Sequence, residues 1–290
     1  MTMDQQWDVV SGVGITALAV AAARAVETSR PDALIEDPYA LRFVEAARAP
    51  AKLPTTEAEA AASDGREYWS EAATYVAVRT RAFDDHFRRA AEVGVTQVVL
   101  LASGLDTRAF RLPWPEDAVV YEIDQPLVLD FKLRVLREHG ATAGGAHRPV
   151  GADLREDWPA ALEAAGFDRA RPTAWLAEGL LPYLPPEAEE RLFQEIHRLS
   201  APGSRLAVED FGNMSAALAD NAADDSVRTL GVNVLDLIHT GQRPTPAARL
   251  TGLGWNVHDV PATRAATEYG RPLSPKFAER DGHYVFAHRS

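Results

Sequence analysis

The sequence contains no cysteine among its 290 residues. Disulfide bonds, thiolate nucleophiles and thiolate metal sites are therefore excluded, and the absence fits a cytoplasmic protein. The eight histidines are scattered without the spacing of metal ligands, so no metal site is expected. The chain also lacks an uncharged apolar run of about 18 residues, so no membrane span is expected. The alanine-rich segment 14–26 has no basic start and no cleavage site, and it is predicted to be a packed helix rather than a signal peptide.

Positive charge is scarce as well, with 30 basic against 42 acidic residues and a net charge of −12. This excess of negative charge disfavours nonspecific binding to nucleic acid and to anionic membranes. The apolar content of 46% is enough for a sizeable core, in one large domain or in one domain with an appendage. No feature of the sequence indicates the oligomeric state.

From residue 96 onward the pattern alternates between short apolar segments and amphipathic segments. The predicted strands are 97–101, 119–123, 147–151, 174–177, 205–209, 255–260 and 283–288. The predicted helices between them are 126–139, 158–165 and 186–199. Such alternation is typical of an α/β fold with a mainly parallel sheet and helices on both faces. The last two strands would add a closing hairpin, which makes the final strand antiparallel.

The remaining segments suggest a division of the chain at residue 92. Residues 1–92 are expected to form an N-terminal helical cap, with one helix before residue 30 and a long helix over 67–91. Residues 50–67 have little apolar periodicity and are expected to form a loop or lid. Residues 93–290 would form the core, with a helical insertion over 212–250 that lies on the carboxyl edge of the sheet.

A turn of small residues follows the first predicted strand, at Ala102-Ser103-Gly104. Such a turn lets a ligand approach the backbone closely. The next strand ends on Glu122 and Asp124, and a carboxylate at that place can accept hydrogen bonds from ribose hydroxyls. The turn has one glycine where a dinucleotide-binding fingerprint has three. An NAD-dependent Rossmann oxidoreductase is therefore an alternative rather than the favoured interpretation.

Acidic residues stand at the carboxyl ends of four predicted strands, namely Glu122 with Asp124, Asp153, Glu178, and Glu209 with Asp210. One such acid commonly caps the next helix, but four in one sheet converge on a single crevice. A crevice with excess negative charge suits a cationic ligand. S-adenosylmethionine is such a ligand, because its sulfonium is positive and its ribose and adenine need hydrogen-bond acceptors.

Several motifs in fixed order carry a resemblance to a known family. They are Thr16-Ala17, Ala21 to Ala25, Asp37-Pro-Tyr-Ala40, Tyr75 to Thr80, Ala102 to Arg108, Tyr121 to Pro126, Gly151 to Leu154 and Ala177 to Leu184. With these motifs the chain resembles the leucine carboxyl methyltransferase-like family over residues 12–290, and in particular its actinobacterial branch of S-adenosylmethionine-dependent methyltransferases. The resemblance implies a class I methyltransferase fold with a Rossmann-like, seven-stranded sheet.

The resemblance also implies roles for individual residues in holding S-adenosylmethionine. Arg79 would contact the methionine carboxylate, and Glu178 would lie near the methionine amine. The turn from Ala102 through Ser103 to Gly104 would line the donor with backbone; the family often has glycine in place of Ala102. Asp124, with Glu122 beside it, would hold the ribose. Asp153 and Leu154 would frame the adenine, and Arg24 is the one candidate for a basic contact that the family has near its N-terminus.

The methyl acceptor is less defined. The resemblance suggests O-methylation of a carboxyl group in a small metabolite or a peptide C-terminus, with S-adenosylhomocysteine as the product. Tyr183, Arg243 and His239 are the candidate acceptor contacts. A carboxylate acceptor needs no general base, whereas a hydroxyl acceptor of secondary metabolism requires one, and His239, His258 or Asp210 would then be candidates. A protein that binds the donor without catalysis is a further alternative.

Overall fold

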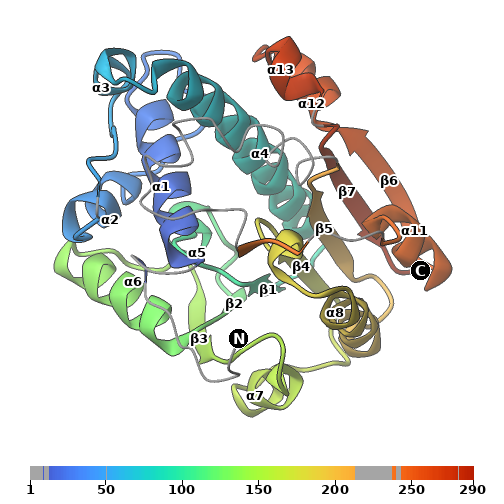
Figure 1. Ribbon diagram of the computed structural model, residues 1–290. Helices are drawn as coiled ribbons and strands as arrows, with labels where there is room; N and C mark the ends of the chain where they lie inside the picture. The colour runs from blue at the N-terminus through green and yellow to red at the C-terminus, as the bar shows by residue number, and fades with distance from the viewer. Residues whose placement is uncertain (1–8, 10–12, 50, 213–236, 240–242, 280) are drawn as a thin grey trace.

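The computed structural model describes residues 9, 13–49, 51–212, 237–239, 243–279 and 281–290 (Figure 1). A single seven-stranded sheet runs through the molecule in the order β3-β2-β1-β4-β5-β7-β6. Within the described ranges no helix is long and apolar enough to cross a membrane. The layers of helix, sheet and helix are those that the alternating sequence pattern predicts.

Five parallel strands form the larger part of the sheet. They are β1 (Gln97–Leu101), β2 (Val119–Asp124), β3 (Ala146–Gly151), β4 (Thr173–Ala177) and β5 (Arg205–Asp210). β1 and β4 are buried along their whole length, which is why they read as continuous apolar runs rather than as alternating ones. Strand order reverses between β1 and β4, so the crevice for a ligand is expected at their carboxyl ends.

The last two strands complete the sheet with antiparallel pairing, as predicted. β7 (His283–His288) lies between β5 and β6 (Asn256–Pro261) and is antiparallel to both. The two strands are not joined by a tight hairpin, because the short helices α12 (Ala262–Glu268) and α13 (Pro275–Ala278) stand between them in the chain.

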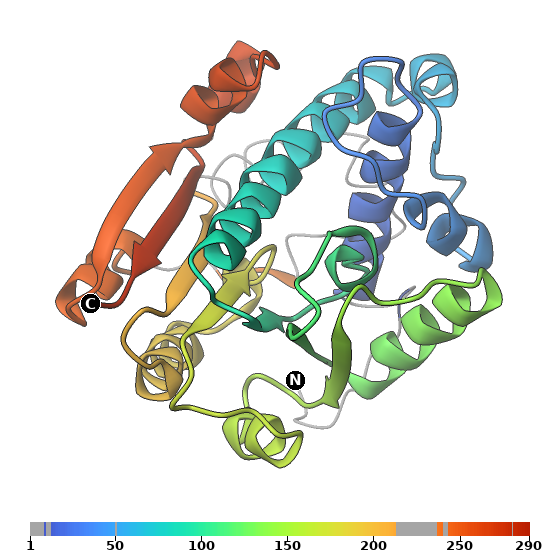
Figure 2. The same cartoon turned by 180° about the vertical axis from the view of Figure 1, so that it is seen from behind.

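Each face of the sheet is covered by its own set of helices. One face packs on α7 (Trp158–Ala164), α8 (Pro186–Leu199) and α11 (Pro246–Gly252). The opposite face packs on the long helix α4 (Arg66–Glu92), the one-turn helix α5 (Arg108–Arg111) and α12 (Figure 2). Prolines occupy the first turns of α7, α8 and of α6 (Pro126–Glu138), where the missing N–H has no partner to lose.

The N-terminal helices form a third apolar cluster beside the sheet. Helices α1 (Gly14–Thr28), α2 (Ala40–Ala46) and α4 share buried side chains with α6.

The expected loop over 50–67 is wrong in part, because the short helix α3 lies at Glu57–Ala62. Its start is fixed by the Thr56 hydroxyl, which accepts a hydrogen bond from the Glu59 amide. The residues of α3 are all alanine or glutamate, which both favour helix. Apolar periodicity does not detect such a helix, because the segment has no large apolar side chains.

The predicted insertion over 212–250 lies mostly outside the described residues. Residues 213–236 and 240–242 are not described, and the C-terminal part of the segment contains the beginning of α11.

A short 3₁₀ helix, Leu181–Tyr183, follows β4 and precedes α8. This helix brings Tyr183 over the carboxyl ends of the strands.

Candidate active site

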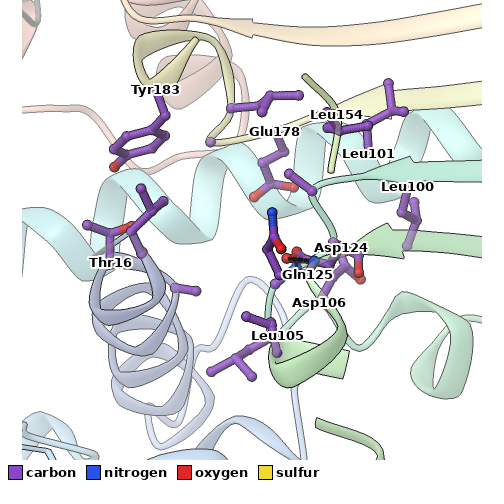
Figure 3. Close-up of a pocket in the computed structure, with 18 of the residues that line it drawn as sticks. Thr16, Leu100, Leu101, Leu105, Asp106, Asp124, Gln125, Leu154, Glu178 and Tyr183 are labelled. Carbon is purple, nitrogen blue, oxygen red and sulfur yellow. Dashed lines mark hydrogen bonds between the residues drawn. The ribbon is translucent and has the colours of Figure 1, made fainter. Parts of the chain in front are cut away.

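A cavity of about 260 Å³ opens at the carboxyl ends of β1, β2 and β4 (Figure 3). Its floor is formed by the residues that follow these strands, and its other wall is α1 from Gly14 to Arg24, about three turns of the helix. The polar side chains that line it in the described part of the chain are Thr16, Arg24, Arg79, Ser103, Asp106, Asp124, Gln125, Asp153, Arg155, Glu178 and Tyr183. The cavity therefore lies where the order of the strands predicts a ligand.

The turn after β1 presents its backbone to this cavity. Ala102 and Gly104 both have positive φ angles, of 50° and 46°. The turn is fastened to the neighbouring strand, because the Ser103 amide donates to the carbonyl of Ile123 at 3.0 Å. The Ser103 hydroxyl is buried and has no hydrogen-bond partner. A Cβ on Gly104 would come within 3.3 Å of the Ala17 side chain, so the turn and α1 approach each other closely.

Asp124 ends β2 and connects that strand to the turn. Its Oδ2 accepts a hydrogen bond from the Gly104 amide at 2.6 Å, and its Oδ1 accepts one from the Gln125 amide at 2.7 Å. Burial raises the pKa of the Asp124 carboxyl, although the two amides act in the opposite direction. Each carboxylate oxygen keeps a second lone pair that can accept a further hydrogen bond from a ligand.

Asp153 and Leu154 line the cavity just after β3. The side-chain amide of Gln125 donates to Asp153 Oδ2 at 2.9 Å, and the backbone amide of Arg155 donates to Asp153 Oδ1 at 2.8 Å. Burial alone would raise the pKa of Asp153, but the hydrogen bonds from Arg155 outweigh it and hold that pKa below its usual value. Asp153 does not cap α7, since that role belongs to Asp157.

Glu178 follows β4 and is held between two guanidinium groups. Arg79 Nε lies 2.8 Å from Glu178 Oε1, and Arg108 Nη1 lies 2.7 Å from Glu178 Oε2. Burial alone would raise the pKa of Glu178, but the two arginines outweigh it, and the net shift is downward. Glu178 is therefore an anion that faces the cavity.

Arg79 reaches the cavity from α4 and has a second carboxylate partner. Its Nη1 lies 3.0 Å from Glu209, which also accepts hydrogen bonds from the Tyr75 hydroxyl at 2.6 Å and the Gly179 amide at 2.8 Å. Glu209 is fully buried, and burial raises its pKa despite the nearby Arg79. Arg79 itself is 4% exposed, so its position is set by Glu178 and Glu209.

A second buried arginine, Arg108, holds the loop that follows the turn. Arg108 is 2% exposed, and its Nε donates to Asp84 at 2.8 Å while its Nη1 contacts Asp106. Asp84 also binds Arg111 at 2.6 Å. Burial alone would raise the pKa of Asp106, but Arg108 outweighs it and the pKa falls to about 2. These side chains fix the loop that carries Asp106 into the cavity.

The α1 wall carries Thr16 and Arg24. In Figure 3 the Tyr183 ring points from the 3₁₀ helix toward Thr16. Burial raises the pKa of the Tyr183 hydroxyl, which keeps it protonated at neutral pH. Arg24 lines the cavity, but its Nε is 2.8 Å from Asp37 and its Nη2 donates to the Leu105 carbonyl at 2.6 Å.

Five residues that the sequence placed at the site lie outside the cavity lining, namely Glu122, Arg243, His239 and the candidate bases Asp210 and His258. Asp210 ends β5 and its Oδ1 accepts a hydrogen bond from the Gly212 amide at 3.0 Å, and His258 is exposed on β6. Glu122 is fully buried beneath the cavity, with Lys132 Nζ at 2.8 Å and His147 Nε2 at 2.9 Å from its carboxylate oxygens. Arg243 is bound to Glu189 at 2.5 Å and to main-chain carbonyls around the 3₁₀ helix. His239 is exposed, and its amide donates to the Pro182 carbonyl at 2.8 Å.

The cavity also contains residues that the sequence did not single out. Gln125 bridges Asp124 and Asp153, and its place directly after the acidic strand end is the signal that could have identified it. Asp106 lies two residues after Gly104, within the motif from Ala102 to Arg108, and its charge directly after the turn is the signal that could have identified it. Thr16 lies in a motif of the resemblance, but no strand end points to it. Within the described residues, no group of three His, Cys, Asp or Glu side chains could hold a metal ion.

Known structures share this architecture. A DUF574 family protein from Streptomyces avermitilis matches with a TM-score of 0.54 at 16% identity, over 94% of this chain and 97% of its own. A protein from Thermobifida fusca, described as a "putative methyltransferase", matches with a TM-score of 0.51 at 20% identity, over 86% of this chain and 94% of its own. At these identities the matches show the fold, which is the class I methyltransferase fold expected from the sequence.

The sequence itself has much closer relatives. A protein of Saccharopolyspora erythraea is 50% identical over 276 residues, covering 95% of this chain and 94% of the relative; its name is "Putative S-adenosyl-L-methionine-dependent methyltransferase". A protein of Rhodococcus jostii with the same kind of name is 46% identical over 280 residues, covering 94% and 92%. Residues 17–197 match the family model described as leucine carboxyl methyltransferase. The chain therefore belongs to the leucine carboxyl methyltransferase family.

Proposed function

We propose that this protein transfers the methyl group of S-adenosylmethionine to a carboxylate oxygen of a small metabolite or a peptide C-terminus. As a member of its family the protein is an S-adenosylmethionine-dependent methyltransferase. The carboxylate acceptor is the finer part of the proposal. It rests on the description of the family and on the side chains that line the cavity.

The cavity fits the donor in three respects. The Ser103 hydroxyl is buried without a partner, which leaves a polar group for a ligand to satisfy. The turn from Ala102 to Gly104 exposes backbone where a side chain would block approach. Asp124 and Asp153 offer acceptors on one side of the cavity, and Glu178 offers an anion on the other.

We assign the donor contacts accordingly. Asp124 would accept from the ribose hydroxyls, and Asp153 with Leu154 would frame the adenine. Glu178 would lie near the methionine amine, with Arg79 toward the carboxylate. We do not include Glu122, because Lys132 and His147 already occupy its carboxylate away from the cavity.

The observation that carries the carboxylate acceptor is the set of titratable groups around the cavity. Among the described lining residues there is no histidine and no lysine. The carboxylates of Asp106, Asp153 and Glu178 are bound to arginines that lower their pKa, so they are weak bases. Burial raises the pKa of Asp124, but its two oxygens accept hydrogen bonds from the Gly104 and Gln125 amides, and we assign this carboxylate to the donor ribose rather than to the acceptor. The Tyr183 hydroxyl is protonated at neutral pH. An acceptor that is already ionised needs no base.

When bound, S-adenosylmethionine supplies a methyl carbon activated by its sulfonium. The residues of this chain then have to hold the acceptor oxygen in line with the carbon–sulfur bond and at near-attack distance. The apolar side chains of Leu180 and Leu184 and the ring of Tyr183 line the cavity beside the 3₁₀ helix. They would exclude water from the acceptor, which strengthens the electrostatic contacts within the site.

The test combines donor binding with product chemistry. Calorimetric titration of the full chain with S-adenosylmethionine and S-adenosylhomocysteine should show saturable binding of both, while reduced nicotinamide dinucleotide should not bind. Methyl-labelled donor is then incubated with a panel of carboxylic acids, peptides and phenols. A carboxyl methyl ester releases volatile methanol in mild base, whereas an ether product does not.

The outcomes separate the candidates. Base-labile label on a carboxylic acid supports the proposal, and base-stable label on a phenol would replace it with a hydroxyl acceptor. Saturable donor binding without turnover on any class would favour a protein that binds the donor without catalysis. Binding of the nicotinamide in place of the donor would contradict the family assignment.

A further inference from the structure

A second hollow lies at the end of the sheet opposite to the active site. It forms at the start of β5 and β6 and the end of β7, with a volume of about 210 Å³. Its polar lining comes from His86, Arg205, Asn256, His258 and His288. None of these side chains lines the methyltransferase cavity.

The strand register brings these side chains onto one face. Arg205 of β5 is opposite His288 of β7, which is opposite Asn256 of β6. Two residues along, Phe286 of β7 is opposite His258 of β6. Directly opposed residues of paired strands project from the same face of a sheet. This face is the one on which α4 packs (Figure 2).

Helix α4 lines the remaining side of the hollow with the side chain of His86. The imidazole of His86 is stacked on the Phe286 ring, with ring centroids 5.9 Å apart. His86 is 6% exposed, and its Nε2 is buried without a hydrogen-bond partner. A buried polar atom without a partner costs free energy, and a ligand in the hollow would supply the missing partner.

Arg205 is the main cation of the hollow. Its Nε is buried and has no hydrogen-bond partner. No ion pair joins Arg205 to any carboxylate of the described residues, whereas the buried guanidinium groups of Arg79, Arg108 and Arg111 all have carboxylate partners. Because Arg205 is only half-buried and has no carboxylate partner among the described residues, its guanidinium can bind an anion from solvent without first breaking an ion pair.

Positive charge dominates the surroundings of His86. Burial lowers the pKa of His86 to about 3, and the charges of Arg205, Arg108 and Arg89 act in the same direction. His86 is therefore neutral and can share one hydrogen bond with an oxygen atom. Arg108 is balanced by Asp84 and Asp106, so the uncompensated positive charge in the hollow comes from Arg205.

We propose that this hollow is a binding site for a phosphoryl group. The guanidinium of Arg205 matches the geometry of phosphate oxygens, and the imidazoles of His86, His258 and His288 with the Asn256 amide surround the same space. A tetrahedral group can accept hydrogen bonds from the sheet and from α4 at once, which a planar carboxylate does less well. The ligand is either inorganic phosphate or the phosphate monoester of a small metabolite.

The experiment follows the histidine resonances of the full chain by NMR during titration with inorganic phosphate, glycerol 3-phosphate and acetate. The imidazole signals of His86, His258 and His288 should shift saturably with one or both phosphates, and less with acetate. Tighter binding of the ester than of phosphate would identify a monoester as the ligand, and the reverse would identify the free ion.

Two variants and a matched control make the test specific. Arg205→Gln should weaken phosphate binding by about 10-fold or more, as expected for the loss of a charge-assisted contact. Arg134→Gln removes the same charge from an exposed ion pair on α6 and should leave phosphate binding unchanged. His258→Ala, an exposed substitution, should weaken binding several-fold without affecting the fold.

Binding of S-adenosylhomocysteine reports on the integrity of each variant, because its cavity lies at the other end of the strands. The proposal is overturned if phosphate produces no saturable shift in the native chain. It is equally overturned if Arg205→Gln and Arg134→Gln bind phosphate alike, or if acetate binds as tightly as phosphate. None of these results depends on whether methyl transfer is observed.

Discussion

The carboxylate of Asp124 accepts a hydrogen bond from the backbone amide of Gly104 at 2.6 Å. This contact joins the turn after β1 to the end of β2, so one residue both shapes the turn and offers a lone pair to the ligand. We expect Asp124→Asn to weaken S-adenosylhomocysteine binding by about 10-fold or more, because a hydrogen bond to a charged group contributes roughly 1.5–3 kcal/mol. Calorimetry measures the loss.

Asp130→Asn is the matched control for this prediction. Asp130 is exposed on α6, and its substitution removes the same charge a short distance along the chain. Its affinity for S-adenosylhomocysteine should equal that of the native chain. Equal affinity for the Asp124 variant would remove Asp124 from the donor site.

Ala102 is held at a φ of 50°, in a region that favours glycine. Replacement by glycine removes the steric cost of a Cβ there, roughly 1 kcal/mol. We therefore expect Ala102→Gly to keep or raise the free energy of unfolding, measured with urea. Ala72→Gly, in the interior of α4, should lower it by about 1 kcal/mol. A destabilisation of the same size in both variants would show that the turn is not strained.

Lys132 and Glu122 form a fully buried ion pair. Removal of Lys132 leaves the buried Glu122 carboxylate with His147 as its remaining described partner, and breaking a buried ion pair costs about 3–5 kcal/mol. We expect Lys132→Met to be strongly destabilising in urea unfolding, and we expect the double variant with Glu122→Leu to lose less than the sum of the two single variants. Additive losses would mean that the two charges are not coupled.

Acid should weaken the fold through Asp106. Its pKa in the folded chain is about 2, below the value of about 3.9 expected in the unfolded chain. A lowered pKa contributes stability above the unfolded value, and this contribution is lost as the pH falls through the folded value. Between pH 5 and pH 2 the loss is about 2 kcal/mol.

Asp106→Asn should remove that part of the pH dependence. The measurement is urea unfolding of both proteins at several pH values from 5 to 2, and the difference between their free energies of unfolding should shrink toward low pH. Asp130→Asn again serves as the control. A constant difference across this range would contradict the lowered pKa of Asp106.

The sequence predicts the sheet better than it predicts the side-chain contacts. The strands β1, β2, β4 and β5 could be located because each has an apolar segment bounded by polar residues. The edge strands β3 and β6 are mostly polar, so the regular alternation of strands and helices is a better guide to them than apolar content. The turn at Ala102 and the carboxylate at Asp124 could be placed together because neighbouring parallel strands end at one edge.

The misplaced residues share a physical cause. Glu122 lies on β2 two residues before Asp124, and this step is enough to move its carboxylate under α6, where Lys132 binds it. Arg243 was expected in the acceptor pocket, yet Glu189 binds it. Each contact joins side chains of two different segments, and the periodicity within one segment carries no information about such pairs.

The place of β7 in the sheet also constrains the order of assembly. β6 pairs with β7 and with no other described strand, although β6 precedes β7 in the chain. During synthesis β6 therefore has no partner until β7 has left the ribosome and entered the gap beside β5. The hollow around Arg205 can form only after this last insertion, whereas the strands below the methyl donor can pair earlier.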